Sequence, residues 1–146
     1  MKINLTIFLL LLMALSVIGQ QTTDQEALLQ KCIDLPEIQN LLPADATGQP
    51  EAIHIMQHAV SFDENMKVSK FGKNLDFLTK DQVYNQNCKA YFRFDRFEID
   101  NNSALISFDF EYNRNALTDP GLVKITLNLQ KNGTEWIITE SKFNWR

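Results

Sequence analysis

The chain has 146 residues, with 14 basic and 18 acidic side chains and a formal net charge of −4 at pH 7. This length suits one domain built around a single core. A protein that binds phosphate backbones usually presents a basic face, and this acidic chain has no run of Lys or Arg. The composition therefore argues against a nucleic-acid partner.

The first residues have the order of a secretory signal. Lys2 supplies a positive charge, an uninterrupted apolar run follows from Ile7 to Leu15, and small or medium residues lead to Gly19. A spanning helix needs about 20 apolar residues, and this run is shorter. We therefore expect a signal peptide over residues 1–19, a secreted or periplasmic protein, and no membrane span after cleavage.

Cleavage after Gly19 would leave one domain over residues 20–146, that is 127 residues with a net charge of −5, because Lys2 is lost. N-terminal sequencing of the exported protein should therefore begin at or near Gln20. Recovery of the chain from the membrane fraction with Met1 intact would contradict this expectation.

The first element after the signal is a predicted helix. Thr23 and Glu26 have the spacing of a capping box, and Leu28, Cys32 and Leu35 then fall on one face. Pro36 ends this helix or starts a second short one.

Three shorter elements are expected before residue 89. Residues 51–60 suit a helix by their position after Pro50 and a strand by their β-branched content, and we favour the helix. Residues 66–71 predict a short strand that ends at Gly72. Residues 79–84 predict one helical turn with a capping box.

Alternating apolar and polar residues predict four strands, over residues 89–99, 103–113, 122–130 and 134–143. Asn101-Asn102 and Asn132-Gly133 suit tight hairpin turns, and Asp119-Pro120-Gly121 ends a longer connection. The expected fold class is α+β, with an N-terminal helix or helices packed on a curved antiparallel meander of four or more strands.

This pattern resembles the cystatin-like and NTF2-like class of α+β folds. The stretch Lys70-Phe71-Gly72-Lys73, the strand from Tyr91 to Ile99 and the turn Gly133-Thr134-Glu135-Trp136 are also similar to small exported domains of Bacteroidota-type bacteria. Inhibitory cystatins carry a Gln-x-Val-x-Gly loop and a Pro-Trp loop. The nearest stretch here, Gln82 to Gln86, lacks the glycine, so the resemblance does not imply protease inhibition.

The strand around Arg93 and Asp95 allows two arrangements. A β-bulge near Asp95 would switch the alternation and turn Phe92, Phe94, Phe97 and Ile99 all inward. A regular strand would instead place Arg93 and Asp95 on the concave face of the sheet, where a carboxylate among aromatic rings could act as a general acid or base.

The aromatic side chains of the meander predict a ligand pocket on the concave face. Its expected residues are Tyr91, Arg93, Asp95, Phe108, Phe110, Tyr112 and Trp136. The favoured function is a non-enzymatic exported domain that binds a protein, a peptide or a small apolar ligand, without a cofactor. The alternative is a small-molecule enzyme of NTF2-like type with its acid or base in that pocket.

The remaining candidate residues suit structural roles. His54 and His58, with Glu51, have a spacing that could bind zinc, but the pattern favours ordinary histidines on an amphipathic segment. Cys32 and Cys88 could form a disulfide or remain buried thiols, and the sequence leaves both open. Asp109 and Glu111 are expected to face solvent, where Lys124 can pair with them across the sheet.

Overall fold

The computed structural model describes residues 23–113 and 121–146. The predicted signal peptide lies outside the described residues, as do Asp119 and Pro120 of the expected connection. Within the two described ranges, no helix is both long and apolar enough to cross a membrane.

The N-terminal segment forms the predicted helix, and of the two alternatives at Pro36 the structure has the second short helix. The first is described over residues 23–33 and is followed by the 3₁₀ helix η1 (Pro36–Leu41), which has Pro36 in its first turn. Leu28, Leu29, Cys32 and Ile33 on this helix are completely buried. The Glu26 carboxylate connects this helix to a distant segment, because it accepts a hydrogen bond from the backbone N–H of Lys67 at 3.0 Å.

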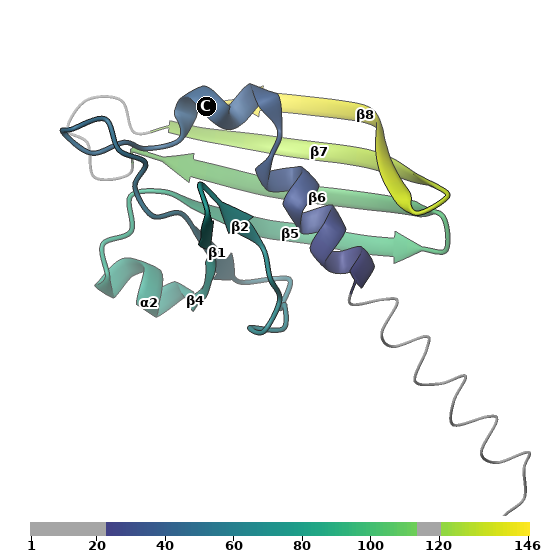
Figure 1. Ribbon diagram of the computed structural model, residues 1–146, viewed down its shortest axis with the longest axis horizontal. Helices are drawn as coiled ribbons and strands as arrows, with labels where there is room; N and C mark the ends of the chain where they lie inside the picture. Colours follow the sequence, from purple (N-terminus) through teal and green to yellow (C-terminus); the bar gives the residue numbers. More distant parts are fainter. Residues whose placement is uncertain (1–22, 114–120) are drawn as a thin grey trace, which may run out of the picture.

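The main sheet has six strands in the order β4-β1-β5-β6-β7-β8 (Figure 1). Strands β5 (Tyr91–Asp100), β6 (Ser103–Tyr112), β7 (Gly121–Asn132) and β8 (Glu135–Trp145) form the antiparallel meander that the alternation predicts. Strands β1 (His54–Gln57) and β4 (Asp76–Thr79) extend it in parallel orientation, so the sheet is mixed and not purely antiparallel.

The expected helix over residues 51–60 is wrong, because this segment contains strand β1. Ile55 and Met56 are adjacent in sequence and both buried, so β1 is covered on both faces. A strand of this kind does not alternate, which hides it from a search for period-two patterns. The β-branched content of residues 51–60, which favoured a strand, was a better indicator of the secondary structure than their position after Pro50.

Strands β2 (Ser69–Lys70), β3 (Lys73–Asn74) and β4 and helix α2 (Lys80–Asn85) lie between β1 and β5 in the chain. Strands β2 and β3 form a small separate hairpin, so the strand expected over residues 66–71 is confirmed only at its end. Helix α2 has the predicted capping box. The Thr79 hydroxyl accepts from the Gln82 backbone, and the Gln82 side chain accepts from the Thr79 N–H.

The bulge in β5 is confirmed. The pairing of β5 with β6 shifts register between Phe94 and Arg96, which leaves Asp95 as the extra residue. Phe92 and Phe94 are consequently fully buried on one face, and Phe97 and Ile99 pack at the margin of the same core. A regular strand would have turned half of these apolar side chains toward solvent.

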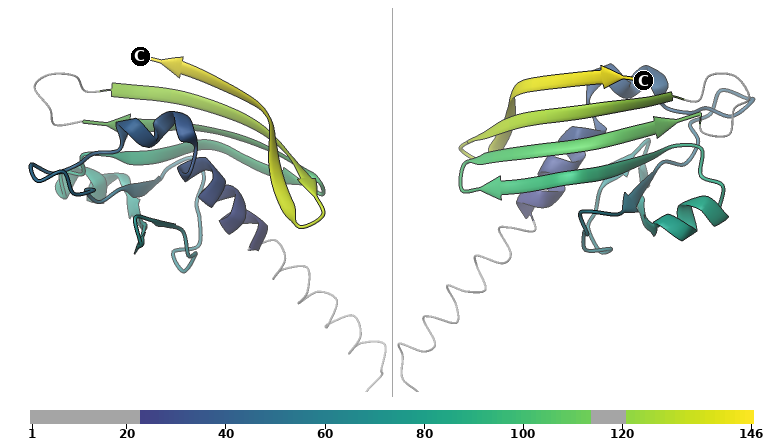
Figure 2. Two further views of the ribbon diagram at one scale, coloured as in Figure 1. Left: turned by 45° about the horizontal axis from the view of Figure 1, so that its top comes forward. Right: turned by 180° about the vertical axis from the view of Figure 1, so that it is seen from behind.

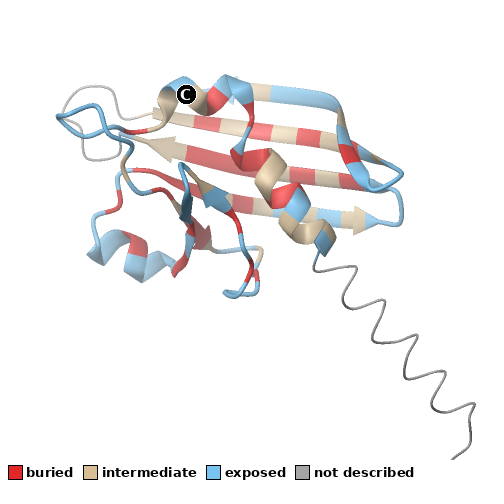
Figure 3. Ribbon diagram, viewed as in Figure 1, coloured by how far each residue is buried: buried red, intermediate tan, exposed pale blue. Residues whose placement is uncertain are grey.

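The sheet is curved, and the N-terminal helix lies inside the curve (Figure 2). Phe62, from the segment between β1 and β2, completes the cover, with its ring centroid 5.3 Å from that of Phe94. On the opposite face, α2 covers a second apolar cluster formed by Met56, Leu78, Val83, Cys88 and Tyr91. Beyond α2, no element covers the outer face of the meander among the described residues (Figure 2, right). Figure 3 shows the other face, where buried residues follow the N-terminal helix and the strands beneath it.

Candidate functional site

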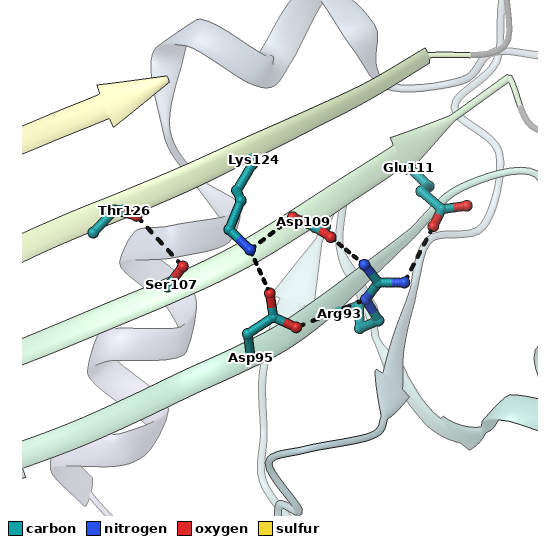
Figure 4. A network of polar contacts seen from close by, with 7 residues as sticks. All are labelled: Arg93, Asp95, Ser107, Asp109, Glu111, Lys124 and Thr126. Atoms are coloured by element: carbon teal, nitrogen blue, oxygen red, sulfur yellow. Dashed lines mark hydrogen bonds and ion pairs between the residues drawn. The ribbon is translucent and has the colours of Figure 1, made fainter. Parts of the chain in front are cut away.

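A network of charged side chains lies on the open outer face of the meander (Figure 4). Arg93 pairs with Asp109 across β5 and β6, and its other nitrogens lie 3.9 Å from Asp95 and 3.7 Å from Glu111. Lys124 of β7 lies 2.7 Å from Asp95 and 3.8 Å from Asp109. The sequence predicted the contact between Lys124 and Asp109 but not the one with Arg93.

Asp109 is the buried member of this network. It was expected to face solvent and does lie on the outer face, but only 4% of it is exposed, because it lies among the other members of the network. Burial by itself would lower the pKa of Arg93, but ion pairing, chiefly with Asp109, raises it above its usual value. Both cations of the network are therefore engaged with carboxylates, and neither is available to an anionic ligand.

The seven residues of the expected pocket do not surround one cavity. Arg93 and Asp95 are on the outer face, whereas Phe108 and Phe110 are fully buried in the core on the other face. The bulge causes this separation. Asp95 is consequently not among the aromatic rings, and it pairs with Lys124 on the outer face instead.

The other three residues of the expected pocket pack against other parts of the fold. Tyr91 belongs to the second cluster under α2. Trp136 is buried in the main core and donates from Nε1 to Asp24 at 3.1 Å. The Tyr112 ring lies over Gly121, where an added Cβ would be only 2.0 Å from the ring.

The histidines and cysteines are not arranged around a metal. His54 is in β1 and His58 lies beyond its end, while Glu51 pairs with Lys89 at 2.6 Å. In the part of the chain that the structure describes, no group of three or more His, Cys, Asp or Glu side chains is placed to hold an ion.

Cys32 and Cys88 are not joined by a disulfide and belong to different apolar clusters, so the structure has the buried-thiol alternative. Burial raises the pKa of the Cys32 thiol. This thiol is therefore a packing group and not a reactive one.

A groove of about 420 Å³ lies between residues 49–53 and the β2–β3 hairpin. Its apolar part comes from Pro50, Ala52, Ile53, Phe71 and Leu75, and its charged part from Glu51, Lys70, Lys73 and Asp76. This size is within the range of small-ligand pockets. None of the side chains of the expected pocket lines this groove.

The hairpin beside the groove is held firmly against the N-terminal helix. The Gln30 side chain donates to the Ser69 carbonyl at 2.9 Å and accepts from the Ser69 N–H at 3.0 Å. Lys70 pairs with Asp34 of the same helical segment at 2.6 Å. These contacts fix the position of Phe71, which directly follows Lys70.

Phe71 is held in an unfavourable backbone conformation. Lys70 pairs with Lys73, so Phe71 and Gly72 form a two-residue hairpin loop, and their φ angles are 53° and 74°. Two positive φ angles define a type I′ turn, for which Asn-Gly is the preferred sequence. A bulky side chain at positive φ is rare, and such strain is concentrated at functional sites. The ring is also 49% exposed, so burial does not compensate for the strain.

The groove offers one charge of each sign to a ligand. Lys70 and Glu51 are engaged with Asp34 and Lys89, whereas Lys73 has no ion-pair partner in residues 23–113 and 121–146. Within the same two ranges, the ion-pair partner of Asp76 is His54, at 3.7 Å. Burial lowers the pKa of His54, although Asp76 acts in the opposite direction, so His54 is neutral at neutral pH and leaves the Asp76 charge uncompensated.

A second hollow of about 390 Å³ adjoins the groove and shares Pro50, Glu51, Ala52 and Lys73 with it. His54 lines this hollow, and its Nδ1 is buried without a hydrogen-bond partner. Lys70-Phe71-Gly72-Lys73 was not among the candidate site residues expected from the sequence. The sequence did contain one indication of this site. A Phe-Gly pair stands between two lysines at a tight turn, where Asn-Gly is the usual pair.

The fold is thus an α+β domain with a mixed six-stranded sheet, and the groove beside the β2–β3 hairpin has the size of a small-ligand site. No protein-family model matches the chain, no curated protein matches its sequence, and no solved structure matches its fold significantly.

Proposed function

We propose that this protein is an exported, non-enzymatic binding domain that takes a short peptide with apolar side chains in the groove beside the β2–β3 hairpin. The observation that carries the proposal is Phe71, an exposed aromatic ring held at positive φ on a hairpin clamped to the N-terminal helix. A rigid, exposed aromatic side chain is the usual form of a binding anchor.

The chemistry of the groove supports a peptide in particular. Pro50, Ala52 and Leu75 provide an apolar surface, and Lys73 and Asp76 provide uncompensated charges of opposite sign. A short peptide has an ammonium group, a carboxylate and apolar side chains between them. Strand β4, which starts at Asp76, is also an edge of the main sheet, and peptides commonly add to such edges.

The concave face is a weaker candidate for the ligand-binding site than the sequence suggests. Phe62, Phe92, Phe94 and Phe108 fill it together with the N-terminal helix. The enzyme alternative also has little geometric support, because the paired Asp95 lies on the opposite face from these rings.

Phe71→Asn is expected to separate binding from stability. Asparagine tolerates positive φ, so the relief of strain should offset the loss of the contact between Lys70 and the ring (5.6 Å), and the free energy of unfolding should change by less than about 1 kcal/mol. Loss of the anchor should weaken peptide binding at least about tenfold. Calorimetric titration with the dipeptide Phe-Leu and urea denaturation measure the two effects.

Tyr84→Gln is the matched control. Tyr84 is 48% exposed and also has a lysine near its ring, but it lies on α2, away from the groove. The control variant should bind as the wild type does. Equal affinity of the wild type and Phe71→Asn for the dipeptide would refute the proposal.

A further inference from the structure

Strand β8 forms an open edge of the main sheet. It is 11 residues long, and residues 139–142 at its centre are all exposed. Of the four large hydrophobic side chains that are exposed in the described ranges, two, Ile137 and Trp145, are on this strand. A long edge strand with exposed apolar residues is a natural template for pairing with another strand.

The backbone of β8 has its free groups at defined positions. The Arg146 N–H donates to the Leu122 carbonyl at 2.9 Å, and hydrogen-bonded and non-bonded pairs alternate along an antiparallel ladder. Trp145, Phe143 and Ser141 therefore direct their N–H and C=O groups away from β7, toward the open edge. A strand that joined this edge would bond to these three residues.

The charges next to Ser141 are self-complementary. Glu140 and Lys142 flank it and lie on the outer face, where they pair with each other at 3.1 Å and Glu140 also accepts from Asn128 at 2.7 Å. If an identical strand pairs antiparallel with Ser141 opposite Ser141, Glu140 of each copy faces Lys142 of the other. These are non-hydrogen-bonded pairs, in which opposed side chains are closest.

From this complementarity we propose that β8 pairs with β8 of a second copy of this chain about a two-fold axis at Ser141. The antiparallel arrangement also brings the Trp145 end of each strand beside the Ile137 end of the other. Trp145 lies on the concave face, opposite Val123, and Ile137 lies on the outer face, opposite Gln130, so the opposed charges and not apolar contact carry the interface. The interface is isologous, because the same strand serves on both sides.

The same features disfavour other partners. The pairing of β7 with β8 is irregular between Asn128 and Leu129, which leaves Thr139 as an extra residue, and a bulge with charges protects an edge from indiscriminate pairing. In a register centred on Lys142, two lysines would face each other, at a cost. The charges therefore select the register with Ser141 at the axis.

A charge-reversal series measured by sedimentation velocity tests this dimer. The purified wild-type protein should show a reversible monomer–dimer equilibrium. Glu140→Lys places lysines opposite lysines, and Lys142→Glu places glutamates opposite glutamates. Each single variant should raise the dimer dissociation constant at least about tenfold.

Two combinations should restore association. An equimolar mixture of Glu140→Lys and Lys142→Glu should form a heterodimer, because every opposed pair then has opposite signs, and the double variant should again form a dimer by itself. Both sites are exposed, so the variants should keep the circular dichroism spectrum of the wild type. A wild-type protein that remains monomeric, or a dimer indifferent to all four combinations, would overturn the proposal. Neither outcome bears on the groove.

Discussion

Arg93→Met should lower the free energy of unfolding by about 2–4 kcal/mol. This is below the 3–5 kcal/mol typical of a broken buried ion pair, because 29% of the Arg93 side chain is exposed. The cost arises mainly from Asp109, which would remain buried with only Lys124 nearby, at 3.8 Å. Urea denaturation at neutral pH measures this loss.

The partner variants distinguish a buried pair from a surface one. Asp109→Val should cost less than Arg93→Met, because Arg93 keeps Asp95 and Glu111. The double variant should be more stable than Arg93→Met, since no buried carboxylate is left without its partner. Lys124→Met should cost at most about 1 kcal/mol, as for an exposed pair. Equal losses for Lys124→Met and Arg93→Met would contradict the central position given to Asp109.

Phe94→Ala should be more destabilising still, by about 3–5 kcal/mol. Phe94 is fully buried directly before the bulge, with ring centroids of Phe62, Phe97 and Phe108 at 5.3, 5.8 and 5.0 Å. Removal of this ring leaves a cavity between β5 and the segment that covers the concave face. A domain with a typical total stability of about 5–15 kcal/mol would lose a large part of it.

Phe143→Ala is the comparison for this variant. Phe143 is only partly buried, near the end of β8, and its removal opens the margin of the core without forming an enclosed cavity. We expect it to cost clearly less than Phe94→Ala in thermal or urea unfolding. Equal costs for the two variants would show that the core is not centred on the β5 bulge.

The sequence was informative where contacts are local. Strict alternation and the Asn-Asn and Asn-Gly turns predicted β5 to β8, and the cluster of phenylalanines around Asp95 predicted the bulge. Strands β1 and β4 escaped prediction because their pairing is parallel and nonlocal, and because both faces of β1 are buried. Neither feature leaves a periodic pattern in a segment of four residues.

The Arg93–Asp109 pair was within reach of the sequence. Counting back from the Asn101-Asn102 turn, a regular hairpin would place Arg93 opposite Phe110, and the one-residue bulge shifts it to Asp109. The two alternatives for β5 thus differed in the partner of Arg93 as well as in the side that Asp95 faces. The groove could not be predicted, because it is formed by residues 49–53 and 70–76, which only the tertiary fold brings together.

Backbone amide NMR during titration with Phe-Leu tests the proposed function most directly. We expect saturable shifts centred on the amides of Phe71, Lys73 and Asp76, with weaker shifts for the N-acetylated dipeptide amide, which lacks both charges. Octanoate binding at the same amides with equal affinity would indicate a site for small apolar ligands instead of peptides. Shifts confined to the concave face, or no saturable shift at the hairpin, would contradict the account.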